Sequence, residues 1–227
     1  MADRISNARK KELEQPDPFL ESMYKTLETV KKIKKQLTII GIIAASIICI
    51  AAVTIYTIRS AETKASVMLT DILKTYSTHK KPDEGYAAVK EQFAKLLNEY
   101  PNTSSGKIGN IKFADICYEV GEYDMAYKHY TYAADDFKND PVMENIIIAS
   151  LGHTCQALKK YQEAAKYFKS ITDGNNELMK DDALFNLGMV AIANGENQKG
   201  VDFLKKLSSQ YENSMYKIIA DDIIARN

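Results

Sequence analysis

The chain of 227 residues contains no tryptophan, three cysteines, five prolines and ten glycines. One of the cysteines, Cys49, lies in a long apolar run, and the two that remain are too few for a disulfide framework. Low-complexity tracts are absent as well. The chain must therefore be stabilised by ordinary packing, and the part after the apolar run, residues 59–227, is long enough to bury a core of its own.

The sequence also lacks an excess of positive or negative charge. The sequence has 30 basic and 30 acidic residues, and residues 59–227 hold slightly more acidic than basic ones. A surface that binds nucleic acid needs a marked basic excess. We therefore expect no nucleic-acid partner.

Motifs of enzymes and metal sites are missing. The sequence has no G-x-x-x-x-G-K, H-E-x-x-H, G-x-S-x-G or C-x-x-C pattern. His79, His129 and His153 are scattered over a loop and two different expected helices, whereas a metal or catalytic role needs groups that converge. We expect a protein that is not an enzyme, with no catalytic residue, no metal, no cofactor and no small-molecule substrate.

The apolar run extends from Leu37 to Ile58 and contains no charged residue. At a rise of about 1.5 Å per residue, a helix of this length reaches about 33 Å, which is enough to cross a hydrocarbon core of about 30 Å. A buried helix of a soluble domain seldom has more than about 14 apolar residues in succession. The run therefore predicts a single transmembrane helix over residues 37–58.

Basic residues gather before this run and are few after it. Those directly before it are Lys31, Lys32, Lys34 and Lys35. Because positively charged flanks stay in the cytoplasm, we place residues 1–36 inside as a cytoplasmic tail and residues 59–227 outside. The tail is longer than the lead of a signal peptide and no small-x-small site follows the run, so we expect an uncleaved anchor.

A second helix is expected before the run. Asp17 can cap free N–H groups, and Pro18 suits the first helical position. An apolar stripe then follows at three- and four-residue spacing, formed by Phe19, Leu20, Met23, Tyr24, Leu27 and Val30. With the four lysines at its end, this amphipathic helix is expected to lie on the anionic membrane surface or to dock on a partner's helix. The alternative is that it continues the membrane helix into the cytoplasm.

Beyond the run, small residues recur with a period of 36 to 38 residues. In the second helix of each unit they are Ala126, Ala164 and Gly200. In the first helix they are Ala114, Gly152 and Gly188. Small residues at both places let two antiparallel helices approach closely, and Tyr130, Phe168 and Leu204 are expected to fill the space against the next pair. One pair cannot bury its apolar face, so the pattern predicts a stack of helix pairs.

The tail of the chain repeats an earlier pattern. Tyr211 and Ser214 mirror Tyr100 and Thr103, so we expect residues 215–225 to form a terminal capping helix. Its apolar face should lie on the last repeat, with its two aspartates, Asp221 and Asp222, outward.

The two cysteines outside the apolar run, Cys117 and Cys155, fall at equivalent places in successive units. Equivalent atoms of stacked helix pairs are roughly 10 Å apart, which exceeds the limit of about 7 Å between the Cα atoms of a disulfide. We expect both to be small core residues.

Across about residues 62–227 these features resemble the tetratricopeptide repeat family, although the periods exceed the usual spacing of about 34 residues. The resemblance implies an all-α fold: an N-terminal transmembrane helix, then a right-handed α-solenoid of about three to four helical hairpins with a C-terminal capping helix. It also implies a concave groove for a protein partner, lined by the first helices. Carried over position by position, the groove residues are Ile111, Asp115, Tyr118, Glu119, Ala149, His153, Gln156, Phe185, Met189 and Ile192.

Several groove residues are apolar, so something should cover them. One candidate is a partner protein. The other is the chain itself, through its terminal helix or the helix after the membrane run.

The whole architecture resembles the ancillary subunit family of the bacterial Sec translocon, whose members are anchored in the inner membrane and carry a periplasmic repeat domain. The resemblance implies the bacterial inner (cytoplasmic) membrane as location, and the Sec translocon or periplasmic chaperones as partners. Two other functions stay open. One is a structural scaffold of another envelope assembly, for secretion, division or outer-membrane biogenesis, and the other is a cytoplasm-facing adaptor of inverted topology.

Overall fold

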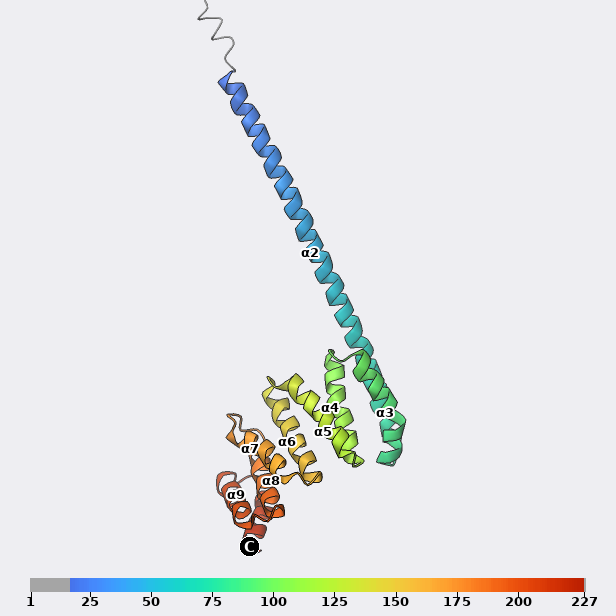
Figure 1. Ribbon diagram of the computed structural model, residues 1–227, viewed down its shortest axis with the longest axis vertical. Helices are drawn as coiled ribbons and strands as arrows, with labels where there is room; N and C mark the ends of the chain where they lie inside the picture. The colour runs from blue at the N-terminus through green and yellow to red at the C-terminus, as the bar shows by residue number, and fades with distance from the viewer. Residues whose placement is uncertain (1–16, 227) are drawn as a thin grey trace, which may run out of the picture. The chain divides into compact units, whose positions relative to one another are not determined.

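The computed structural model describes residues 17–226, and over this range the chain is helical and contains no strand (Figure 1). The helices in chain order are α2 (Pro18–Ser77), α3 (Pro82–Glu99), α4 (Ser104–Glu119), α5 (Tyr123–Phe137), α6 (Pro141–Ala157), α7 (Tyr161–Asp173), α8 (Lys180–Ala193), α9 (Asn197–Gln210) and α10 (Lys217–Arg226). From α3 onward each helix packs chiefly against its neighbours in the sequence, as in a helical solenoid. The predicted all-α fold is confirmed.

The chain divides into two units between Ile58 and Arg59. The described part of the first unit is the front of α2, and all its side chains are exposed. Among the described residues, α2 is the one helix long and apolar enough to cross a membrane, and none of its apolar stretch is buried. This finding rests on the length and composition of the stretch, which fit a membrane anchor or a signal sequence. Residues 1–16, the first part of the predicted cytoplasmic tail of residues 1–36, lie outside the described residues.

Helix α2 begins where predicted. The Asp17 side chain accepts a hydrogen bond of 2.9 Å from the backbone N–H of Phe19, and Pro18 takes the first helical position. No proline follows before Pro82, so nothing ends the helix ahead of the apolar run. A separate helix on the membrane surface is therefore not found, and the alternative of one continuous helix holds. The four lysines that were expected at the membrane surface all lie on this helix, and all are exposed: Lys31, Lys32, Lys34 and Lys35.

The second unit consists of stacked helix pairs. The end of α2 packs against α3 through fully buried residues such as Ile72 and Phe93. Three hairpins follow, α4–α5, α6–α7 and α8–α9, and α10 packs on α9. The predicted number of hairpins and the terminal cap are both confirmed.

The turns inside the three hairpins are alike. Each contains one residue with a left-handed backbone: Gly121 (φ +81°), Lys159 (φ +60°) and Gly195 (φ +83°). The N–H of the following residue donates to a carbonyl five residues earlier, that of Cys117, Cys155 and Ala191, at 2.8 Å each time. This is the Schellman pattern, in which a left-handed residue ends a helix. The same local geometry at the same place shows that the three units share one register.

The small residues of the repeat lie where the helices come closest. A Cβ atom added to Gly200 would lie 2.7 Å from the carbonyl oxygen of Gly188, so α8 and α9 approach backbone to backbone. A Cβ atom on Gly152 would lie 2.7 Å from the ring of Phe168. Glycine at these positions thus makes room for the facing helix.

The large residues of the second helices lie over the small residues of their own hairpins. Phe168 lies over Gly152, and Leu204 lies over Gly188, which are the small residues of their own hairpins. Tyr130 likewise donates its hydroxyl to Asp115 of its own hairpin, at 2.7 Å. The expected packing against the next pair is present as well. Tyr130 is hydrogen-bonded to Ser150 of α6, and Phe168 lies in one buried cluster with Leu187 and Val190 of α8.

The terminal cap follows the internal mirror. The N–H of Ser214 donates to the carbonyl of Tyr211, as the N–H of Thr103 donates to that of Tyr100. Ala220 of α10 is fully buried. The aspartates of α10, Asp221 and Asp222, are exposed as predicted.

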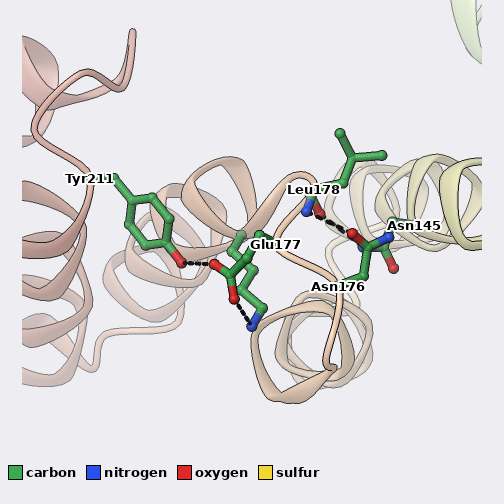
Figure 2. A network of polar contacts seen from close by, with 6 residues as sticks. Asn145, Asn176, Glu177, Leu178 and Tyr211 are labelled. Carbon is green, nitrogen blue, oxygen red and sulfur yellow. Dashed lines mark hydrogen bonds and ion pairs between the residues drawn. The ribbon is translucent and has the colours of Figure 1, made fainter.

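The loop between α7 and α8 is tied on both sides (Figure 2). On one side Asn145 of α6 donates its amide to the carbonyl of Leu178, at 2.8 Å. On the other, Glu177 accepts from the hydroxyl of Tyr211, at 3.2 Å, and from Lys180, at 2.8 Å. These bonds hold the start of α8 against α6 and against the end of α9.

A carboxylate of α2 caps α4. Glu62 accepts hydrogen bonds from the backbone N–H groups of Ser104 and Ser105, at 2.7 and 3.0 Å, and from the Ser105 hydroxyl, at 2.6 Å. The first N–H groups of a helix have no partner within it, and they favour a negative charge. Hydrogen bonding, above all from the Ser105 hydroxyl, lowers the pKa of the Glu62 carboxyl. This contact joins α2 to the first hairpin.

We expect Glu62→Gln to destabilise the packing of α2 on α4 by about 1 kcal/mol, because the amide loses the charge and one acceptor oxygen. Since the folded pKa lies below the ordinary value, the parent's advantage is complete above that value and disappears as the pH falls through the folded pKa. Hydrogen exchange of the first amides of α4, measured against pH, reports the effect. Glu91→Gln, at an exposed position of α3, is the control and should leave exchange unchanged. Equal exchange in both variants would contradict the cap.

Candidate interaction surface

Five of the ten predicted groove residues line one open hollow of about 430 Å³, which we call the central hollow. They are Tyr118, His153, Gln156, Phe185 and Met189. The hollow crosses α4, α6 and α8, the first helices of the three hairpins. Ala157 and Asn186 also line it and were not predicted. Both directly follow a predicted residue on the same helix, which is the signal that could have found them.

The walls of the central hollow are fixed by packing. Tyr118 is 36 % exposed, and its ring meets that of Tyr123 edge to face at 5.3 Å between centroids. The ring of His153 meets Phe168 in the same way at 5.2 Å. Such aromatic contacts hold the rings in defined orientations.

The central hollow is polar in part but uncharged. Burial lowers the pKa of His153, and the nearby charge of Asp182 opposes this only partly, which favours the neutral imidazole. Gln156 and Asn186 add neutral amides, and no charged residue lines the hollow. The site offers hydrogen bonds and apolar contact rather than charge.

The chain itself occupies both ends of the predicted groove. At one end Glu119 accepts a hydrogen bond of 2.7 Å from the hydroxyl of Tyr76 in α2. At the other, Tyr216 stacks on Phe185, with ring centroids 4.8 Å apart, and donates its hydroxyl to Asp182 at 2.6 Å. The chain thus covers its own groove at both ends, as one of the two alternatives expected, while the central hollow stays open.

Four predicted groove residues lie elsewhere. Ile111 and Ala149 are only 7 % and 2 % exposed, so they belong to the core and offer no side chain to a partner. The side chain of Ile192 turns toward α9 and takes the space beside Gly200, where an added Cβ atom would lie only 2.6 Å from it. Asp115 is engaged by Tyr130 and by Lys112, at 2.7 and 3.2 Å. A first helix packs against helices on two sides, so only a narrow stripe of it remains free.

The cysteines and histidines form no reactive group. Cys117 and Cys155 are free and fully buried, as predicted for core residues, and burial raises their thiol pKa values to about 12 and about 11. His129 bonds to Asn110 at 2.8 Å, and burial lowers its pKa to about 4. Over residues 17–226, no cluster of histidine, cysteine and carboxylate side chains could hold a metal ion.

One of the three hairpins matches a known repeat family. Residues 182–214, which contain α8 from its third residue on, α9 and the beginning of the turn after α9, match the tetratricopeptide repeat model. No curated protein matches the sequence. Among solved structures, the crystal structure of MamA is similar with a TM-score of 0.46 and 16 % identity, over 63 % of this chain and 87 % of that one. The tetratricopeptide repeat match covers one hairpin, α8–α9, and the two hairpins before it have the same turn geometry.

Proposed function

We propose that this chain is a membrane-anchored scaffold that binds a segment of a partner protein in the central hollow. The observation that carries the proposal is the convergence of side chains from three successive first helices around an open space. Both neighbouring parts of the groove are filled by the chain's own tyrosines, so the open part has a defined length. A partner segment would enter between them.

The lining determines what kind of segment fits. Tyr118, Phe185 and Met189 offer apolar contact, and methionine adapts its shape to different partners. His153 and Gln156 offer hydrogen bonds without charge. Aromatic and apolar anchors usually carry most of the affinity of such a surface. The expected ligand is an uncharged, partly apolar peptide or helix.

The proposal includes the anchor and its direction. Residues 37–58 span the bacterial inner membrane, residues 1–36 lie in the cytoplasm, and residues 59–227 lie in the periplasm. Support comes from the lysines directly before the apolar run. In its specific form, the scaffold links the Sec translocon with periplasmic chaperones. Co-purification after mild detergent extraction separates this role from that of a scaffold in another envelope assembly.

The central hollow is tested by crosslinking in the cell. A photo-crosslinking residue at Gln156 should capture a partner, and the double variant Tyr118→Ala with Met189→Ala should weaken its affinity by about tenfold or more. Neither residue is buried in a helix-pair contact, so circular dichroism should remain unchanged.

The matched control replaces an exposed tyrosine and an exposed methionine that lie outside the central hollow, Tyr132→Ala with Met215→Ala. This control should capture the partner like the parent chain. Unchanged capture by the Tyr118 and Met189 variant, with its fold intact, would mean that the partner binds another surface.

A further inference from the structure

A second hollow, of about 410 Å³, lies between α7 and α9, on the second helices rather than the first. We call it the α7–α9 slot. Its floor is formed by Leu187 and Val190 of α8, which are nearly fully buried. Its apolar walls include Ala165 of α7 and Phe203 of α9. The slot shares no lining residue with the central hollow.

The preceding repeat shows how such a slot can be filled. Between α5 and α7, Tyr127 reaches across to Tyr167, with the hydroxyl oxygens 2.8 Å apart and the ring centroids 6.5 Å apart. Tyr127 directly follows the small residue Ala126. In the next unit the residue that directly follows Ala164 is Ala165. The α7–α9 slot is therefore open because an alanine stands where the previous repeat has an aromatic ring.

The facing wall indicates which ring is missing. Phe203 stands three residues after Gly200, as Tyr167 stands three residues after Ala164. In the α5–α7 pair the two tyrosine hydroxyls bond to each other. Phe203 has no hydroxyl, so the hydroxyl of a tyrosine placed opposite it would have no such partner. A phenylalanine ring matches this wall better than a tyrosine ring.

The rim of the slot is basic. Its charged residues are Lys166, Lys169, Lys199 and Glu196. Lys199 is paired with Glu196, at 2.8 Å, and Lys169 with Asp173. Among the described residues Lys166 has no ion pair. The ammonium group of Lys166 is thus not neutralised by a carboxylate in the described part of the chain, and it favours an acidic ligand at the rim.

We propose that the α7–α9 slot binds a phenylalanine side chain of a partner segment in which acidic residues flank that phenylalanine. The ring takes the place that Tyr127 fills in the preceding pair. The flanking carboxylates meet the lysines of the rim. The chain then has two separate protein-binding surfaces, one on the first helices and one on the second.

The test uses a fluorescein-labelled peptide, Glu-Asp-Phe-Glu-Asp, and the full chain in neutral detergent. Fluorescence anisotropy should show saturable binding. A peptide with alanine in place of phenylalanine, and one with lysines in place of the acidic residues, should each bind at least about tenfold more weakly. Absence of binding, or equal binding of the three peptides, would overturn the proposal.

Two variants of the chain locate the peptide. Ala165→Tyr fills the slot as Tyr127 does and should weaken binding by about tenfold or more, while Ala87→Tyr, at an exposed position of α3, should not. Lys166→Glu with Lys199→Glu should weaken binding to a similar extent, whereas Lys205→Glu, exposed on α9 outside the slot, should not. If Ala165→Tyr fails to fold, the lysine variant decides alone. Binding that survives the lysine exchange would show that the peptide does not lie in the slot.

Discussion

Replacing Gly200 with leucine should lower the free energy of unfolding by about 3 kcal/mol or more. A Cβ atom at this position would lie 2.7 Å from the carbonyl oxygen of Gly188 and 3.2 Å from the backbone nitrogen of Ile192. These are backbone atoms of α8, so they cannot give way as a flexible side chain could. The two helices have to separate, which also uncovers Leu204 and Leu207, both fully buried.

The loss of stability from the clash has to exceed a gain in helix propensity. Leucine favours a helix over glycine by roughly 0.8–1 kcal/mol, so Gly200→Leu would stabilise α9 if the position were open. Lys205→Leu places the same side chain at an exposed position of the same helix and is the matched control. Urea unfolding followed by circular dichroism compares the two. A Gly200→Leu midpoint at or above that of the parent chain would show that α8 and α9 are not in backbone contact.

The helices and their pairing could be predicted from the sequence because both depend on short-range patterns. Ala126, Ala164 and Gly200 recur at nearly constant spacing, and each lies where its helix approaches its partner. The mirror between Tyr100 and Tyr211 predicted the turn before α10 and its packing on the last hairpin. In a solenoid each unit contacts only its neighbours, so a local pattern is enough to set the register.

The direction of individual side chains could not be predicted in the same way. Ile111 and Asp115 are separated by about one helical turn, yet the first is buried in the core and the second is partly exposed. Ile192 stands at a position that lines the groove in the tetratricopeptide repeat family. Here its side chain instead enters the space that Gly200 leaves on α9. The widths of the free stripes on the first helices depend on such pairings, which become visible only in three dimensions.

The length of α2 could not be predicted from the sequence pattern either. The stripe that begins at Phe19 and the apolar run from Leu37 have different periodicities, which suggested two helices. Neither proline nor a cluster of glycines separates them, and a helix without a breaker continues. Similarly, the α7–α9 slot depends on one alanine, Ala165, whose meaning appears only when Tyr127 is seen filling the matching place.

The membrane anchor should fail when lysines replace Ile47 and Ile48, near the middle of the apolar run. Each lysine at the centre of a membrane helix costs about 2.5–3.5 kcal/mol, whereas each large aliphatic residue contributes only about −0.3 to −0.6 kcal/mol. The aliphatic residues of the run therefore sum to on the order of −5 kcal/mol, and two lysines cancel this sum. Both isoleucines are exposed, so no contact within the described chain offsets the cost.

In a bacterial host, the double lysine variant should leave the carbonate-washed membrane fraction, and Ile47→Leu with Ile48→Leu should remain in it. In the orientation proposed for the parent chain, protease added to spheroplasts should digest residues 59–227 and spare the tail before the run, because positively charged flanks stay in the cytoplasm. If the lysine variant stays with the washed membrane, residues 37–58 are not the anchor. If the repeats resist protease in spheroplasts but not in lysed cells, the anchor stands and its direction is reversed, so that the central hollow faces partners in the cytoplasm.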